Sequence, residues 1–444
     1  MNMHEIMEFL GIYFLGWPLI ITCLIVGLVC TIAFNFIQIR YFCSMWRSIL
    51  RPAEKLQAGA DVTPLQAFIN TMSANIGNGS LAGMAAAIAT GGPGAVFWVA
   101  AIGVLLMSVR FAEVYLSIYY GKQSTTSSGL GGPMLYLQYV PGGSVLPTIY
   151  AAVMLVMSLI VGNAMQVNTI GLSLNTTWDI PTWITAIVSS VLIFYIVTGG
   201  AQRISAASEK IVPLKVIIFF STSLTILAYH WNQIGSALQL IWHSAFHETA
   251  AVGAVLGFSV QQAMRFGTAT SIFATESGLG SAAIFFGFTK SKTPMQDSIL
   301  SMLNAFITTI VCVIIGLCII VSGTWTTGLT SSQLTIATYQ TTFGSLGGLI
   351  VTFLSIAFGI GVIVSFAYIV KETWAFLTGG RFSLFINIVY CLVAFAGTLA
   401  SVKTIFSLVE IFNGAVLFIN LYGILCLVPV VAREVSKFRA EKHN

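Results

Sequence analysis

The segment Asn75-Ile-Gly-Asn-Gly-Ser80 decides how this chain folds, because it places two glycines and three polar side chains at the centre of an apolar run. Residues 64–90 around it are long enough to cross a bilayer, for which about 20 apolar residues suffice. Polar side chains are costly in hydrocarbon, and glycine weakens a helix. The segment therefore predicts a transmembrane helix that is interrupted near the middle of the membrane.

The composition of the whole chain indicates that lipid surrounds it. Of its 444 residues, 57% are hydrophobic and only 7% are charged, whereas soluble domains carry about 25% charged residues. We therefore predict an all-α polytopic membrane protein with eleven transmembrane helices, and the lipid bilayer as a partner. The expected spans are 9–37, 64–90, 93–120, 146–172, 181–199, 211–229, 250–288, 297–322, 347–370, 384–401 and 405–431.

The positive charges fall on alternate loops. Nearly all of the 19 Lys and Arg residues follow odd-numbered spans, and the loops at 91–92, 173–180, 230–249 and 323–346 contain none. Because cytoplasmic loops are rich in Lys and Arg, we expect the N-terminus outside and the C-terminus in the cytoplasm. The membrane that we expect is the inner membrane of the cell. The cations flank apolar spans and form no basic face, so the net charge of +5 does not indicate nucleic acid.

Ten spans remain after the first, and they divide into two sets of five with opposite orientation. Such halves are typical of inverted-repeat transporters, in which the first helix of each half is broken at the binding site. We expect both the second and the seventh span to be broken. The predicted parts are an extra N-terminal helix and cytoplasmic linker at 1–60, a first repeat at 61–249, a second repeat at 250–432 and a cytoplasmic tail at 433–444.

The first break would offer backbone groups to a solute and its ion. The N–H groups and positive dipole end at Gly79 and Ser80 suit a carboxylate, and freed carbonyl oxygens at 74–77 suit a cation. Close helix packing through Gly79 and Gly83 is the alternative, but it does not explain two asparagines in the membrane. The residues of this segment that we expect to bind substrate are Asn75, Gly77, Asn78, Gly79 and Ser80.

The seventh span offers two positions for its own break. One is Arg265-Phe-Gly-Thr268 at its middle, and the other is Glu276-Ser-Gly-Leu-Gly280. The sequence leaves open whether Gly267 or Gly278 marks the break, and a kink with hydroxyl groups bonded to their own backbone is the alternative. We expect the substrate ammonium to meet carbonyl groups at Phe266, Gly267 and Thr268.

Three amides lie on the fourth span, namely Asn163, Gln166 and Asn168. Their spacing spreads them over about 180° of a helix, so only one or two of them can face one cavity. Interhelical hydrogen bonding is an equally good interpretation of this pattern.

Charged residues near the spans suggest gating or structural roles. Glu113 and Glu276 lie near cytoplasmic ends, where salt bridges with Arg110 or other cations and ordinary solvated helix ends are both open. Arg265 lies deep in the seventh span, so it must pair with an opposite charge or line water.

The sequence shows no catalytic constellation. All five His residues lie in tails or outside loops, and the seven Cys residues form no CxxC pair. His243 and His247 precede Glu248, but this is not an HExxH motif and we expect no metal there. A membrane-embedded enzyme would need an acid, base or metal cluster within the spans, so we expect neither an enzyme nor a cofactor, apart from Na+ as a possible coupling ion.

Several motifs resemble the alanine/glycine:cation symporter family. The resemblance covers about 61–380 and implies a LeuT-type fold with eleven helices, together with sodium-coupled or sometimes proton-coupled uptake of alanine or glycine. It also implies that the amino acid lies at both breaks and is lined by Gln166 or Asn168. The motifs are 61–123 with Gly77-Asn-Gly-Ser-Leu-Ala-Gly83, Gly131-Gly-Pro-Met134, Gly162-Asn163, Gly199-Gly200, Arg265-Phe-Gly267 and Thr275-Glu-Ser-Gly-Leu-Gly-Ser-Ala282.

The chain departs from the family pattern at three places. The family usually has GTGN where this chain has Gly77–Ser80, and NEAGLG where it has Thr275–Gly280. On the ninth span Gly359-Ile360 replaces a Ser-Thr pair. Because an ion needs several oxygen ligands, Ser355 or Ser365 would have to substitute through a shift of register. The cation site that we predict comprises Ala74, Gly77, Ser355 and Ser365.

These observations together predict a secondary active transporter. We expect it to import a small neutral amino acid, alanine or glycine, with a coupled cation, and we favour Na+ over H+. An uncoupled carrier or exchanger on the same scaffold is the main alternative.

Overall fold

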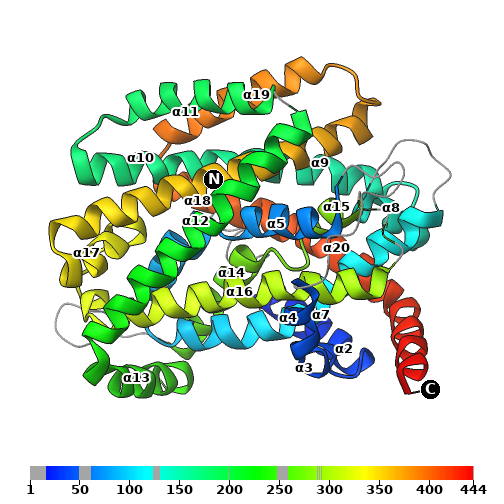
Figure 1. Cartoon of the computed structure of the whole chain (residues 1–444), viewed down its shortest axis with the longest axis horizontal. Helices are drawn as coiled ribbons and strands as arrows, with labels where there is room; N and C mark the ends of the chain where they lie inside the picture. The colour runs from blue at the N-terminus through cyan, green and yellow to red at the C-terminus, as the bar shows by residue number, and fades with distance from the viewer. Residues whose placement is uncertain are drawn as a thin grey trace.

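The computed structural model is all-helical, without a strand in the part of the chain that it describes. It describes residues 17–49, 62–123, 131–198, 200–247, 259–287, 289, 291 and 293–443. Among these described residues, six spans are long and apolar enough to cross a membrane, and most of them run roughly along the horizontal of Figure 1. They are α7 (Ala95–Gln123), the run of α9 (Leu146–Leu159), η2 (Ile160–Ala164) and α10 (Met165–Trp178), then α12 (Gly200–Tyr229), α16 (Pro294–Val321), α18 (Ser345–Thr378) and α20 (Val402–His443).

Three shorter apolar helices, of 17, 16 and 17 residues, accompany these spans. They are α2 (Trp17–Ala33), α11 (Thr182–Val197) and α19 (Ser383–Leu399). The predicted first span, 9–37, begins outside the described residues. Within them, α2 ends at Ala33, because Asn35 and Phe36 adopt left-handed backbone conformations. The short helices α3 (Ile37–Arg40) and α4 (Phe42–Ile49) follow.

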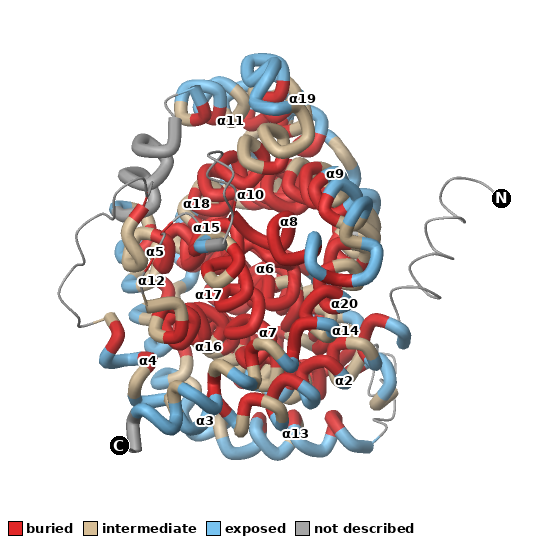
Figure 2. The backbone as a smooth tube through the Cα atoms, turned by 90° about the vertical axis from the view of Figure 1, so that its right-hand side faces the viewer, coloured by how far each residue is buried: buried red, intermediate tan, exposed pale blue. Residues whose placement is uncertain are grey.

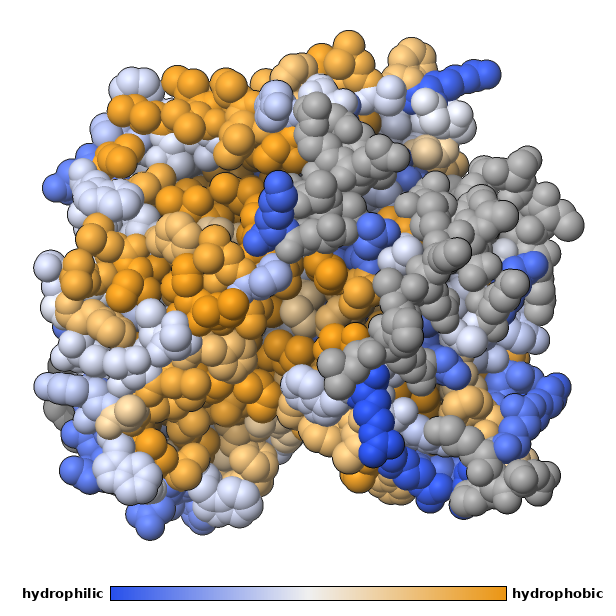
Figure 3. All heavy atoms as spheres, in the orientation of Figure 1, coloured by the Kyte–Doolittle hydropathy of each residue, from blue (hydrophilic) through white to orange (hydrophobic). Residues whose placement is uncertain are grey.

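The surface of the helical body is apolar, as lipid requires. Side chains such as Val188, Val191 and Leu392 are largely exposed on α11 and α19. Hydrophobic residues cover much of the central face in Figure 3, and hydrophilic residues gather toward its left and lower right edges. Such a contiguous apolar surface marks contact with a membrane. Buried residues occupy the centre of the body, around α6, α7 and α18 (Figure 2).

The second span is interrupted at the predicted place. Helix α5 (Pro64–Asn75) ends before Ile76 and Gly77, and α6 (Asn78–Gly91) begins directly after them. The Gly77 backbone is extended there, with φ −124° and ψ −173°. The peptide groups on either side of this pair therefore leave the regular helical hydrogen-bond ladder.

The seventh span is interrupted near Gly278. Helix α14 (Val260–Thr275) is followed by a turn and then by α15 (Ser281–Gly287). Positive φ angles at Glu276, Gly278 and Gly280 end the first helix. Of the two positions that the sequence left open, Gly267 is not the break, because residues 265–268 lie inside α14, where carbonyl groups belong to the helical ladder.

The two interrupted spans begin with the same device. Thr63 Oγ1 accepts from the Gln66 N–H at 3.2 Å, and Gln66 Oε1 accepts from the Thr63 N–H at 3.1 Å. Ser259 and Gln262 form the same pair of bonds, each at 3.1 Å, at the start of α14. Each pair is a capping box, which fixes where a helix starts.

Short helices lie in the connections between spans. We predicted these segments to be loops, including the outside loops 230–249 and 323–346. In Figure 1, α13 and α17 lie at the left end of the body, and α8 and the C-terminus lie toward its right. The connecting helices are α8 (Pro133–Tyr136), η1 (Leu137–Tyr139), η3 (Trp231–Gln233), α13 (Ile234–Phe246), η4 (Thr324–Thr326) and α17 (Ser331–Phe343).

Candidate functional site

The first interruption is held by polar contacts to two other spans. The Asn78 N–H, at the start of α6, donates to Gln166 Oε1 at 3.2 Å. The Asn78 side chain donates through Nδ2 to the Ser355 carbonyl of α18 at 3.1 Å. A helix start without such acceptors would leave N–H groups unpaired in the membrane. Gln166 and Ser355 therefore stabilise the start of α6.

Gln166 is oriented by an irregular turn of its own span. Helix α10 begins directly after η2, a π-helical turn, and such turns frequently occur at functional sites. Gln166 Nε2 donates to the Val161 carbonyl of this turn at 3.2 Å. This contact directs Oε1 of the same amide toward the Asn78 N–H.

The other two amides of this span point to a different helix. Asn168 Nδ2 donates to the carbonyl groups of Gly397 and Ala400 at 2.9 Å each. Asn163 Nδ2 donates to the Tyr390 carbonyl at 2.6 Å. All three acceptors belong to α19 or its end. The structure thus places Gln166 at the first interruption and gives Asn163 and Asn168 the interhelical contacts that were the alternative.

A lysine occupies the carbonyl side of the first interruption. Lys215 is fully buried in α12, and its Nζ donates to the Ser73 carbonyl at 3.1 Å and to the Ile76 carbonyl at 2.6 Å. Ile76 lies within the segment 74–77 whose carbonyl groups we predicted to bind the cation, and Ser73 directly precedes it. Among the Lys and Arg residues that set the orientation, Lys215 looked like one more charge at the start of a span, so we did not predict it as a site residue. The available signal was one lysine within the otherwise apolar run 211–220.

The two serines predicted for the cation site have other surroundings. Ser355 Oγ accepts from Ser173 Oγ at 3.3 Å, and Ser365 Oγ is buried without a hydrogen-bond partner in the described structure. Neither hydroxyl is a hydrogen-bond partner of Lys215 Nζ. A cation site at Ala74, Gly77, Ser355 and Ser365 stays a prediction.

The second interruption is filled by side chains of the protein. Glu113 Oε2 accepts from the N–H groups of Gly278 at 3.0 Å and Gly280 at 3.1 Å. Arg110 Nη1 forms an ion pair with Glu113 Oε1 at 2.9 Å, and Arg110 Nη2 donates to the Thr275 carbonyl. Both charged side chains are fully buried. The peptide groups of this turn are therefore satisfied without a ligand.

Glu113 and Glu276 do not lie at solvated helix ends, which was one of the two interpretations of their positions. Glu113 is buried, and so is Glu276, whose Oε2 accepts from Ser281 Oγ at 2.7 Å. The Arg110 pair makes Glu113 a structural residue of the second interruption. The spacing of the two residues, three apart on one helix, was the signal for this pair.

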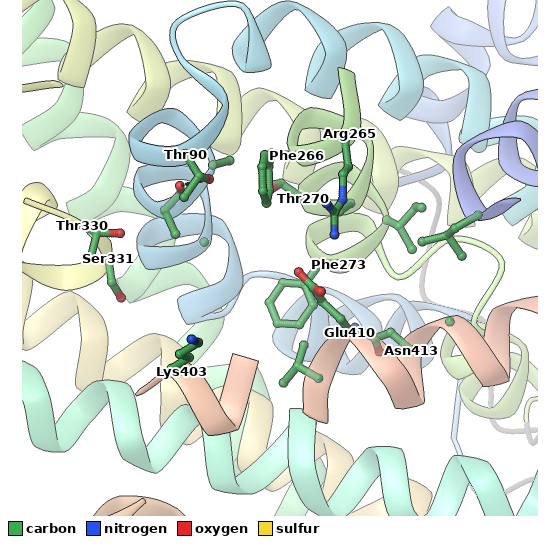
Figure 4. A pocket seen from close by; sticks show the side chains of 18 of the residues that line it. Thr90, Arg265, Phe266, Thr270, Phe273, Thr330, Ser331, Lys403, Glu410 and Asn413 are labelled. Carbon is green, nitrogen blue, oxygen red and sulfur yellow. Dashed lines mark hydrogen bonds between the residues drawn. The ribbon is translucent and has the colours of Figure 1, made fainter. Parts of the chain in front are cut away.

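A cavity of about 510 Å³ opens beside α6, along Gly83 to Thr90 (Figure 4). Helices α6, α14 and α20 supply most of its wall. Arg265 of α14 and Glu410 of α20 point into it from different sides. Its volume lies within the range of small-ligand sites. The other polar residues that line it are Thr90, Thr270, Thr330, Ser331, Lys403 and Asn413.

Phe273 separates this cavity from the first interruption. Its side chain lines the cavity, and its ring lies so close to Gly79 that a Cβ there would overlap with it. A Cβ at Gly83 would lie at an ordinary 3.9 Å from the same ring. An aromatic side chain of α14 thus packs against the small residues of α6. This contact corresponds to the close helix packing that was the alternative to a binding site at this segment.

The predicted residues of α14 point in different directions. Phe266 lines the cavity, and the Arg265 guanidinium lies 5.3 Å from the centre of its ring. Gly267 faces α7, because a Cβ there would lie 2.6 Å from Trp98 Cβ. Thr268 is fully buried, and its hydroxyl has no hydrogen-bond partner in the described structure. Their predicted contact with a substrate stays a prediction.

The described residues contain no cluster of three or more His, Cys, Asp or Glu side chains that could hold a metal ion. His243 and His247 stack at 4.6 Å between ring centres and are exposed on α13. The interruptions and the cavity suit the binding of a polar solute within the membrane.

Known proteins resemble this chain over its whole length. The model of the sodium:alanine symporter family matches residues 1–444. An uncharacterized transporter of Haemophilus influenzae is 31% identical over 443 residues, which are 99% of this chain and 96% of that protein. The sodium/alanine symporter AgcS of Methanococcus maripaludis is 29% identical over 427 residues, which are 94% of this chain and 93% of that protein. A probable sodium/glutamine symporter of Bacillus subtilis is 26% identical over 427 residues, covering 96% and 88%.

A solved structure shares the fold. The substrate-bound, outward-open state of a Na+-coupled sialic acid symporter aligns with a TM-score of 0.51 and 13% sequence identity. The alignment covers 93% of this chain and 85% of that protein. These findings confirm the family resemblance, the helical membrane fold and the prediction of a transporter instead of an enzyme.

Proposed function

This chain belongs to the sodium:alanine symporter family, and from that premise we propose that it imports a small neutral amino acid, alanine or glycine, by secondary active transport. The coupled cation would be Na+, which names the family, or H+. The observation that carries the proposal is the interrupted span α5–α6 beside a cavity lined by both a cation and an anion. An amino acid is a zwitterion, and Arg265 and Glu410 suit its two charges.

We propose a LeuT-type arrangement, in which an extra N-terminal helix precedes two inverted repeats of five spans. Six long spans, three shorter apolar helices and the two interrupted spans support this count of eleven. The matching capping boxes before α5 and α14 support equivalent positions for the two interrupted spans. The repeat boundaries 61–249 and 250–432, the outside N-terminus and the inner-membrane location belong to the same proposal.

We propose that the amino acid enters the cavity first and reaches the first interruption when Phe273 moves. Its carboxylate would then meet α6 near Gly79, where the positive end of the helix dipole lies. Gln166 and Asn78 would line that position. At the second interruption, Glu113 and Arg110 already bind the N–H groups of Gly278 and Gly280 and the Thr275 carbonyl. We therefore assign the substrate to the first interruption and give the second a structural role.

An uncoupled carrier or exchanger on the same scaffold is the second candidate. The specific observation in its favour is Lys215, whose amine lies against the carbonyl groups that would otherwise receive an ion. The substrate also remains a proposal, because the names of relatives include both an alanine and a glutamine symporter.

Uptake of labelled alanine into proteoliposomes tests the proposal. Vesicles with an inward Na+ gradient, with an inward H+ gradient and with neither are compared with protein-free vesicles. Accumulation above equilibrium under one gradient identifies a coupled symporter and its ion. Saturable equilibration without accumulation identifies the uncoupled carrier. No uptake of alanine, glycine or another neutral amino acid above that of protein-free vesicles would contradict the proposed function.

A further inference from the structure

Lys215 is a charged side chain in the interior of a membrane protein. It is fully buried in α12, where an ionised group is costly unless it has partners. No carboxylate of the described residues forms an ion pair with it. Its two hydrogen-bond partners are backbone carbonyl groups at the end of α5. The partners of this amine are thus of the kind that bind a metal cation.

The end of α5 attracts a cation for two reasons. The last carbonyl groups of a helix lack intrahelical donors, and the helix dipole places negative charge at the same end. At this end the Ile76 N–H donates to Met72 and the Gly77 N–H donates to Asn75, so the helix supplies no donor to Ser73 or to Ile76. Lys215 Nζ satisfies both of these carbonyl groups. The ammonium therefore lies where the unpaired oxygens and the dipole together favour positive charge.

Helix α18 closes the other side of this position. A Cβ at Gly361 would lie 2.8 Å from Lys215 Nζ and 3.0 Å from Ser73 Oγ, so a larger residue there would push the amine from its position. Ser73 Oγ donates to the Gly361 carbonyl at 3.0 Å, which joins α5 to α18 at this level. The Phe358 ring lies 5.5 Å from Nζ, within the range of a cation–π contact. Three spans therefore enclose the amine.

We propose that the Lys215 ammonium takes the place of a coupled cation at the first interruption, so that these carbonyl groups bind no sodium. The inference rests on the proposed function and narrows its choice of ion, because without Na+ at this site H+ coupling or the uncoupled carrier is left. Substrate binding next to α6 then requires no Na+ at this position, because the protein supplies the positive charge itself. Lys215 acts here as a positioning residue, since it holds the carbonyl end of the interruption and does not touch the substrate.

A thermal-shift experiment on the purified full chain tests this inference. Alanine is titrated in sodium buffer and in choline buffer, since a ligand stabilises the state that it binds. For the wild type we expect apparent affinities that agree within about twofold in the two buffers. Lys215→Ala vacates the position, so its alanine response should weaken at least about tenfold in choline and recover in sodium. Lys215→Met fills the space without charge and should respond weakly in both buffers.

Lys437→Ala is the matched control, because Lys437 is exposed and pairs with Glu434 at 2.7 Å on the surface. It should behave like the wild type. If alanine shifted the melting temperature of the wild type only in sodium buffer, the inference would be overturned. This comparison needs only the wild type, so it tests the inference even if Lys215→Ala does not fold. Failure of the proposed function differs visibly, because no amino acid would then shift the melting temperature in either buffer. In that case, the effect of sodium alone on the melting temperature still tests the inference. A sodium-induced shift in Lys215→Ala that is absent from the wild type would support replacement of the ion by the ammonium. An equal shift in both proteins would overturn the inference.

Discussion

Asn75 and Thr275, the last helical residues before the two interruptions, are joined by a hydrogen bond from Asn75 Nδ2 to the Thr275 carbonyl at 2.9 Å. Arg110 donates to the same carbonyl. The ends of α5 and α14 therefore meet in the interior. If one interrupted span moves, either this hydrogen bond breaks or the other span moves with it. This contact links the substrate side of the molecule to the Arg110 and Glu113 pair.

Removing the contact between the interruptions should cost stability and transport. In Asn75→Ala, the Thr275 carbonyl keeps only Arg110 as a donor, and interhelical hydrogen bonds in membranes contribute about 0.6 kcal/mol on average. We expect a slightly lower melting temperature and a clearly lower rate of alanine uptake, because the two spans lose their shared contact. Melting in detergent and uptake in vesicles measure these effects. Wild-type behaviour in both assays would contradict the coupling of α5 to α14.

The amides of the fourth span should separate into one substrate residue and one structural residue. Gln166→Ala removes the acceptor of the Asn78 N–H and should raise the KM for alanine by about tenfold, the effect of roughly 1.4 kcal/mol. Asn168→Ala removes two contacts to α19 and should lower the melting temperature while the KM stays near the wild-type value. Initial uptake rates at several alanine concentrations give both constants. The reverse pattern would show that Asn168 contacts the substrate.

Phe273 and Gly79 should respond to substitution as a pair. Gly79→Ala places a Cβ against the Phe273 ring and should reduce uptake strongly, whereas Gly83→Ala adds only an ordinary contact at 3.9 Å and should be tolerated. Combining Gly79→Ala with Phe273→Ala removes the overlap, so uptake should recover in part, which is the signature of directly coupled residues. A double variant as inactive as the sum of the single variants would show that the ring does not act on the interruption.

The buried ion pair at the second interruption should control stability more than substrate affinity. Glu113→Gln leaves Arg110 buried with an uncompensated charge, and breaking such pairs costs about 3–5 kcal/mol. We expect a marked fall in melting temperature with little change in the alanine concentration that gives half-maximal shift. The combined variant Arg110→Met and Glu113→Gln removes both charges and should recover part of the lost stability. A changed alanine affinity at unchanged stability would instead assign the pair to the substrate site.

The sequence predicted the interrupted spans better than it predicted their partners. The first interruption follows from Gly77 and its neighbours, which act locally on one helix. The second was ambiguous because Gly267 and Gly278 both fit, and only the left-handed conformations at 276–280 decide between them. Gly267 serves a close approach of α14 to α7, which a single sequence does not distinguish from a break.

Lys215 and the cavity depend on tertiary packing and were not predicted. The rule that counts Lys and Arg near span ends treated Lys215 as one more cytoplasmic charge, although α12 carries it against the end of α5. Glu410 and Asn413 line the cavity with Arg265 only because α20 and α14, more than a hundred residues apart in the chain, both face it. Contacts of this kind have no local pattern in one sequence.

The most direct test of a substrate site at the first interruption is alanine uptake by Gly77→Leu in proteoliposomes. A side chain at Gly77 would overlap with Val362 and approach Gln166 Oε1, so it would fill the space beside α6. The variant is first shown to be inserted, monodisperse and reconstituted in the same amount as the wild type. We predict saturable uptake by the wild type and none above protein-free vesicles by Gly77→Leu. Uptake by the variant at the wild-type rate would contradict a substrate route through this interruption.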